Sequence, residues 1–121
     1  MISAPQGLGV PIPVPVTGAT SATGQILANE TNVSITANTN ILSSNITIPA
    51  YGIVAVYFTT NTSGVLSAVI NGVTATINQG GTLNTGTWYE FVMYAGQGMT
   101  LNFQFSASAT VSLIVVFIPL A

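Results

Sequence analysis

The sequence predicts an all-β protein: an antiparallel two-sheet sandwich, wired as a single jelly roll, with an extended Pro-rich arm at its N-terminus. From Gly24 onward, β-branched and aromatic residues dominate, and clusters of Asn, Gly, Ser and Pro interrupt them at short spacing. No segment shows the apolar period of a helix. Many short strands at this spacing are typical of a sandwich or barrel closed on itself. The Cys–Trp–Cys pattern of immunoglobulin domains is absent, which favours the jelly roll.

The predicted arm covers residues 1–21, ahead of a sandwich domain at 22–121. Proline fixes φ and has no N–H, so the alternating prolines exclude a helix or a central strand here. The segment must run extended, as polyproline II or along a sheet edge. One register of it is wholly aliphatic. It is therefore either a stiff linker or an arm that reaches a neighbouring subunit through Val10, Ile12, Val14 and Val16.

The strands of the sandwich domain follow from runs of Val, Ile, Thr, Tyr and Phe between turn residues. Asn71-Gly72 supplies two residues that tolerate positive φ, as a type I′ turn requires, so the strands on either side form a tight hairpin. The Gly-rich stretches 79–81 and 96–98 are turns, because a phosphate loop needs a following Lys and helix. The expected strands are 25–28, 33–36, 45–48, 53–59, 65–70, 73–77, 87–94, 99–105 and 110–118.

Strands 87–94 and 110–118 carry apolar side chains on both faces. Strands that are apolar on both sides are usually covered on both sides, whereas the outer face of a lone sandwich is wet. We therefore expect a neighbouring subunit or the Pro-rich arm to cover the second face. In strand 87–94 one face consists of Tyr89, Phe91 and Met93, and the other of Trp88, Glu90, Val92 and Tyr94.

Charged side chains make up 2% of the chain, where an ordinary soluble domain has about 25%. Lys, Arg, His, Asp and Cys are absent, and Glu30 and Glu90 are the acidic side chains. Nucleic-acid binding is not expected, because it draws on Lys and Arg at phosphates. No catalytic, metal or cofactor site is expected either, since the usual nucleophiles, bases and ligands are missing. A Glu30–Glu90 pair of the glycosidase type is the one arrangement left, and nothing in the sequence brings the two together.

With so few charges, the surface must be covered by uncharged polar residues, by glycans or by neighbouring subunits. An ordinary secreted domain is one interpretation, and a subunit of an assembly is the other. Four Asn-x-Ser/Thr sequons are candidate glycosylation sites, although a chain rich in these residues produces several by chance. They begin at Asn29, Asn32, Asn45 and Asn61.

No window reaches the ~18 apolar residues of a membrane-spanning helix, so no direct membrane span is expected. The N-terminal segment lacks both the basic region and the continuous apolar region of a secretory signal. If Met1 is the native start, release with a virion at lysis is one route by which the protein leaves its cell.

Residues 64–119 begin GVLSAVINGVTATINQGG and end VSLIVVFIP. In their uncharged, Thr-, Asn- and Val-rich strands and their aliphatic last strand, they resemble small single-jelly-roll-like β-sandwich structural proteins of archaeal viruses. They resemble archaeal surface filament subunits more weakly. The resemblance covers about half the chain and rests on composition rather than on a motif. It implies a capsid, turret or filament subunit.

We expect a virion structural protein, a capsid, penton, turret or spike subunit that packs against copies of itself and other virion proteins. One alternative is an archaeal pilus or thread subunit on the cell surface, whose arm completes the sheet of the next subunit by strand addition. A second is a carbohydrate-binding adhesive module. The candidate residues for these contacts, in a subunit interface or in stacking, are Trp88, Glu90 and Tyr94.

The scarcity of ionisable groups predicts a stability that hardly changes across acid pH. Acid unfolding works by protonating carboxylates that are paired in the native state or by charging buried histidines. Here only Glu30, Glu90 and the C-terminus can take up protons. We expect the urea unfolding midpoints at neutral pH and at about pH 3 to agree closely. A steep fall of the midpoint between them would contradict the prediction.

Overall fold

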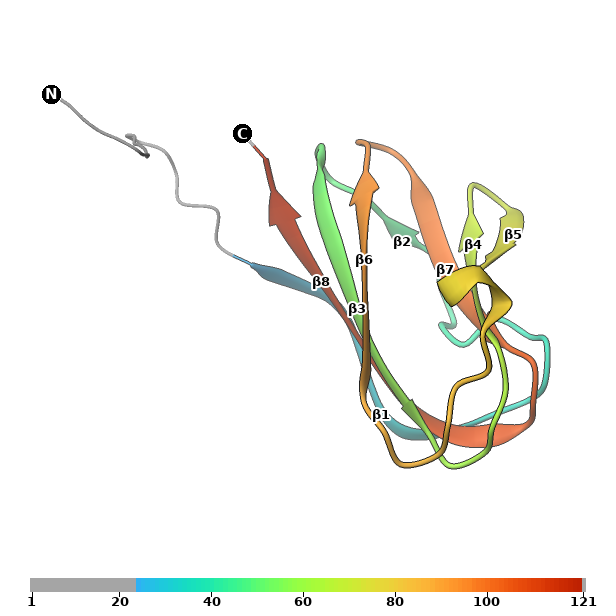
Figure 1. Ribbon diagram of the computed structural model, residues 1–121. Helices are drawn as coiled ribbons and strands as arrows, with labels where there is room; N and C mark the ends of the chain where they lie inside the picture. The colour runs from blue at the N-terminus through green and yellow to red at the C-terminus, as the bar shows by residue number, and fades with distance from the viewer. Residues whose placement is uncertain (1–23, 121) are drawn as a thin grey trace, which may run out of the picture.

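The computed structural model describes residues 24–120, which form two four-stranded antiparallel sheets packed face to face as a sandwich (Figure 1). The predicted all-β antiparallel sandwich is therefore confirmed. The predicted arm, residues 1–21, lies outside the described residues, and so do its four aliphatic positions. The strands are β1 (Gln25–Ile35), β2 (Ile46–Thr47), β3 (Gly52–Thr60), β4 (Leu66–Ile70), β5 (Val73–Thr76), β6 (Tyr89–Ala95), β7 (Thr100–Phe105) and β8 (Ala109–Pro119).

Strand pairing follows a nested order along the chain. β1 pairs with β8, β2 with β7, β3 with β6 and β4 with β5, each pair antiparallel. The contacts β3–β8 and β4–β7 then join these pairs into two sheets, with strand orders β1-β8-β3-β6 and β2-β7-β4-β5. Successive strands therefore alternate between the sheets except at the β4–β5 hairpin, and β1 and β6 are the edges of the first sheet.

The core lies between the two sheets. Along β3, Val54, Val56 and Phe58 are fully buried and alternate with residues that face outward. Phe58 meets Phe105 of β7 across the core, with ring centroids 5.3 Å apart. Burial of each such side chain contributes about 1.5–3 kcal/mol to stability. Further fully buried residues are Ile48, Leu66, Leu83, Leu101, Phe103, Val111, Leu113, Val115 and Phe117.

β1 is one strand of 11 residues, whereas the sequence predicted two strands, at 25–28 and 33–36, with a turn between them. That prediction is wrong because β-bulges accommodate the polar residues between the two predicted strands, so the strand is not interrupted there. The register with β8 shifts twice along β1. Asn32, within the second shift, has a φ of 50°, and its backbone N–H donates to Ser112 Oγ at 2.9 Å. Asn adopts this left-handed conformation at lower cost than most residues, so the strand continues.

The hairpin predicted at Asn71-Gly72 is confirmed. The two residues have φ values of 49° and 82°, as a type I′ turn requires, and the first pair of the ladder is Ile70 with Val73. Asn71 Oδ1 accepts the backbone N–H of Thr100 at 2.9 Å, so the turn is also fastened to β7.

The remaining predicted strands are present, with ends that differ from the predicted ones by at most two residues. The predicted turn at 79–81 overlaps a short 3-10 turn, η1 (Asn78–Gly80). Within residues 24–120, no helix has the length and apolar character needed to cross a bilayer.

Asn102 is a buried polar side chain that holds a loop against the edge of β7. It is 1% exposed; its Oδ1 accepts the N–H of Leu42 at 3.0 Å, and its Nδ2 donates to the Leu42 carbonyl at 3.0 Å. Nδ2 also donates to Asn45 Oδ1 at 2.9 Å. The side-chain amide thus pairs with backbone groups of the loop in place of a strand ladder, as buried backbone groups require.

Replacing Asn102 should therefore destabilise the fold more than replacing a neighbouring polar residue. Asn102→Ala leaves the buried N–H and C=O of Leu42 without these partners, which costs about 1–3 kcal/mol. Gln104→Ala is the control, because Gln104 is on the same strand and its bond to Asn40 is exposed. Urea unfolding should show a clearly larger loss for the first variant; equal losses would refute this role of Asn102.

Candidate subunit interface

The outward side of the β1-β8-β3-β6 sheet is apolar across its full width. Residues that are partners in register on neighbouring strands point to the same face of a sheet. Ile26 on β1, Val116 on β8, Ala55 on β3 and Val92 on β6 are such partners, so they form one row across all four strands. The adjacent row contains Ile118, Ile53 and Tyr94. We call these two rows, with Tyr51, the apolar outer face.

Much of the apolar outer face is open to solvent in a single chain. Ile26 is 63% exposed, Val92 62% and Tyr94 71%. Tyr51, directly before β3, is 55% exposed and stacks on Tyr94, with ring centroids 6.5 Å apart and an angle of 6° between the ring planes. Trp88, directly before β6, is also 55% exposed. Scattered exposed apolar residues are ordinary, but a contiguous patch marks an interaction site.

The patch has the size expected of such a site. It is four strands wide, or about 19 Å at a strand spacing of ~4.8 Å, and along β3 it extends from Tyr51 to Ala55, or about 16 Å at a rise of ~3.3 Å per residue. The enclosed area, on the order of 300 Å², lies at the lower end of the range in which the largest apolar patch of a monomer is often functional.

The outward side of the other sheet differs in kind. Its rows run through Gln104, Ser67 and Thr76, and through Asn102, Val69 and Thr74. Polar side chains dominate both rows. The molecule therefore has one polar and one apolar sheet surface, although almost none of its residues is charged.

The third row of the apolar sheet is more polar and contains Glu90. Its members in register are Asn29, Ile114, Tyr57 and Glu90. The pKa of Tyr57 is raised above its ordinary value of 10.0, because its hydroxyl hydrogen-bonds to the Glu90 carboxylate and lies in the field of that charge. Glu90 is therefore partnered at the border of the apolar outer face.

The predicted two-sided character of strand 87–94 is confirmed in β6. Tyr89, Phe91 and Met93 pack against the core, while Glu90, Val92 and Tyr94 are exposed. The candidate residues Trp88, Glu90 and Tyr94 are thus on the surface of the single chain rather than in its core. Sequence reasoning missed Ile26, because its position on this face depends on the bulged register of β1.

Glu30 and Glu90 do not form a catalytic pair. Glu30 lies opposite the fully buried Leu113 and lines a shallow depression with Ser43 and Ser44, so it points to the inner side of the sheet. Glu90 points to the outer side of β6, the opposite edge strand. Three strand spacings, about 14 Å, separate the two strands. Glycosidase carboxyl groups lie about 5–9.5 Å apart.

All four sequon asparagines are exposed. Asn29 and Asn32 lie on β1, and Asn32 lines a polar depression of about 480 Å³ together with Asn61. Asn61 Oδ1 accepts the backbone N–H of Thr110 at 2.9 Å, and Asn45 Oδ1 accepts from Asn102. The sequons are thus placed where a glycan could be attached, and their use stays a prediction.

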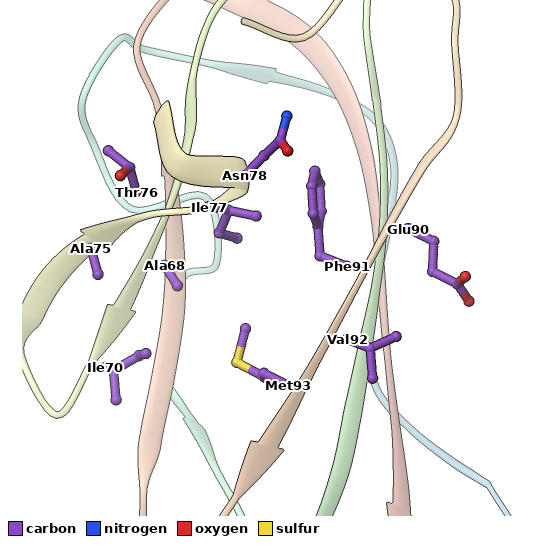
Figure 2. Close-up of a pocket in the computed structure, with 10 residues that line it drawn as sticks. All are labelled: Ala68, Ile70, Ala75, Thr76, Ile77, Asn78, Glu90, Phe91, Val92 and Met93. Atoms are coloured by element: carbon purple, nitrogen blue, oxygen red, sulfur yellow. The ribbon is translucent and has the colours of Figure 1, made fainter. Parts of the chain in front are cut away.

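A groove of about 420 Å³ lies at the open edge of the sandwich, between β6 and the β4–β5 hairpin. Figure 2 shows Phe91 and Met93 pointing into it from β6, toward Ile77 and Ala68 on the other side. Glu90 and Val92 point away from it. Ile70 and Ala75 extend the lining, so the groove is mainly apolar. Sequence reasoning missed this groove, which arises only when the two sheets pack.

The contact between Tyr57 and Glu90 gives a pH-dependent prediction. Because the folded-state pKa of Tyr57 is raised, its contribution to stability is present below pH 10 and is lost as the pH rises through the raised value. Glu90→Gln removes the charge, so the pKa of Tyr57 should fall toward 10.0. Ultraviolet titration of tyrosine absorbance, with Tyr57→Phe used to assign the curve, measures this change. An unaltered titration in Glu90→Gln would show that the two groups do not interact.

Comparison of the chain with protein-family models and with curated protein sequences finds no match. The function is therefore inferred from the geometry of the described residues and from the composition of the chain.

Proposed function

We propose that this chain is a virion structural protein, a capsid, penton, turret or spike subunit that acts by packing against copies of itself and against other virion proteins, with no catalysis. The observation that carries the proposal is the apolar outer face, which leaves Ile26, Val92 and Tyr94 exposed in the single chain. Burial of apolar area between subunits contributes about 25 cal/mol per Å², from which the entropic cost of association is subtracted.

The near absence of charge favours association through this face. Charged side chains normally keep proteins soluble and apart, and here Lys, Arg, His and Asp are absent. A copy that covers the face meets only Glu90 at its border, so little charge has to be desolvated. The polar outward side of the other sheet can remain in water. In a shell it would be the solvent-facing side.

The strand order supports the finer assignment of the fold as a single jelly roll. A jelly roll has eight strands in two sheets and is found in viral capsid and lectin domains. The nested pairs of this chain, wrapped into the orders β1-β8-β3-β6 and β2-β7-β4-β5, agree with that wiring. Because one fold serves several functions, the wiring supports a capsid role without deciding it.

Composition places the proposed subunit away from the genome. Nucleic-acid binding draws most of its free energy from Lys and Arg at phosphates, and the chain has neither. A lipid layer or another protein would separate the subunit from nucleic acid inside the virion.

Two other functions each have one observation in their favour. The free edge of β6 suits a pilus or thread subunit that assembles by strand addition on the cell surface. The stacked, exposed Tyr51 and Tyr94 suit a carbohydrate-binding adhesive module, in which sugar rings pack on aromatic faces. Neither alternative accounts for the aliphatic row through Ile26 and Val116.

A charge placed on the apolar outer face tests the proposal. Val92→Glu should abolish or strongly weaken assembly, because the carboxylate would be buried between copies. Thr74→Glu is the control: Thr74 is exposed on the outward side of the other sheet, in register with Val69, and lies outside both the apolar outer face and the groove lining. Electron microscopy and light scattering of the full-length variants at equal concentration measure particle formation.

Particles from the control but not from Val92→Glu would support the proposal. Equal assembly of both variants would remove the apolar outer face as the interface. If the unmodified chain stays monomeric at high concentration and glycan arrays show binding that Tyr94→Ala removes, the adhesive module is the better account.

A further inference from the structure

β6 is the least protected sheet edge in the described part of the chain. Natural edge strands are blunted by bulges, short length, Lys or Pro. At the other edge of the same sheet, β1 has two bulges, and in the second sheet β2 and β5 have two and four residues. β6 has seven residues, YEFVMYA, in unbroken register with β3 and without Pro or Lys. Its one charged side chain, Glu90, lies on the outward side of the sheet in register with Tyr57.

The free backbone groups of β6 can be identified from the ladder. Tyr51 and Asn61, just outside the two ends of β3, are hydrogen-bonded to Leu120 and Thr110. Antiparallel ladders alternate strictly, so odd-numbered residues of β3 bond to β8 and even-numbered ones to β6. The β6 partners of those even residues are Tyr89, Phe91 and Met93. The N–H and C=O groups that point to the free edge are therefore those of Glu90, Val92 and Tyr94.

The groove of Figure 2 lies directly beside this edge. Phe91 and Met93 supply its β6 wall, and Ile70, Ala75 and Ile77 lie across from them. A strand added to β6 would therefore hydrogen-bond to the free edge of β6, and its inward-facing side chains would lie over the apolar groove.

We propose that residues 10–16 of a neighbouring copy add to the free edge of β6 as a parallel strand and insert their aliphatic side chains into this groove. The inference rests on the proposed function, since it names the contact that links one copy to the next. Residues 1–23 precede the described part of the chain, so the segment is tethered by only a short connection to Gly24.

The alternation of Val or Ile with Pro matches what this edge needs. In parallel pairing, a residue bonds to the two residues flanking the one it lies opposite. A residue opposite Phe91 or Met93 therefore bonds to the free groups of Glu90, Val92 and Tyr94, and its side chain points into the groove. Val10, Ile12, Val14 and Val16 have the N–H that these positions require.

The prolines fill the other positions. Pro11, Pro13 and Pro15 then point their side chains outward, and the N–H that each lacks would have faced solvent. The added strand thereby presents a proline edge that cannot template another strand. Seven residues in extended form span about 20 Å, the length of β6.

A second copy is favoured over the chain's own arm. β1, the strand that follows the arm in the sequence, is the opposite edge of the same sheet. A direct path from there to β6 crosses three strand spacings, about 14 Å, of the apolar outer face. It would lay the polar residues 17–23 over the surface that the proposed interface buries. An arm from a neighbouring copy avoids this path.

Site-directed cross-linking tests the docking in the full-length protein. The chain has no cysteine, so introduced thiols are the only ones present. The groove pair consists of one preparation with Val14→Cys and a second with Ala75→Cys, which lies in the groove. In the control pair, Ser34→Cys, at an exposed position on β1, takes the place of Ala75→Cys. After the two preparations are mixed and treated with a short bismaleimide cross-linker, the groove pair should give the heterodimer as the major product, and the control pair should not.

Serine substitutions in the arm test the same docking through assembly. The double variant Ile12→Ser, Val14→Ser should fail to assemble. The double variant Thr17→Ser, Thr20→Ser is the control and should assemble normally.

The outcomes separate this inference from the proposed function. Assembly that survives Ile12→Ser with Val14→Ser, or equal cross-linking of the groove and control pairs, overturns the docking and leaves the subunit function standing. A third preparation carries Val14→Cys and Ala75→Cys in the same chain; if cross-links form only within that chain and not between the single variants, the docking is overturned in favour of the chain's own arm. Failure of the unmodified chain to assemble at all refutes the proposed function itself.

Discussion

A sheet that is apolar on both faces is usually covered on both faces, and this constraint governs the β1-β8-β3-β6 sheet. Its inner face is covered by the second sheet, through contacts such as Phe58 with Phe105. Its outer face carries Ile26, Val92 and Tyr94 at more than 60% exposure. In most proteins charged side chains would occupy such positions. The free energy of burying this face is therefore still available for association, and the proposed assembly uses it.

The same constraint explains why the two sheets differ in their outward sides. The second sheet has shorter strands and a polar outward side, and it is held by the Asn71-Gly72 turn and by the hydrogen bonds between the amide of Asn102 and the distant Leu42. Because it is covered on its inner side and wet on its outer side, it needs no partner. The first sheet has the longer strands, the apolar outer face and the free edge of β6. We propose that association proceeds through it, by face contact and by strand addition.

Much of this could be predicted from the sequence where the physics is local. The period of two in 87–94 identified both faces of β6, and Asn71-Gly72 identified the hairpin, because each signal lies within a few residues. The continuity of β1 was mispredicted, since the bulge at Asn32 depends on Ser112, far along the chain. Ile26 and the groove beside Phe91 also escaped prediction, because both exist only once register and sheet packing are set.

The most direct test is sedimentation velocity of the unmodified full-length chain over a wide concentration series. We expect a reversible shift from monomer to discrete larger species as concentration rises, because an exposed apolar face without opposing charge associates by mass action. A single monomeric boundary across the whole series would contradict it: the apolar outer face would then be compatible with a solitary molecule, and the low charge would need another explanation.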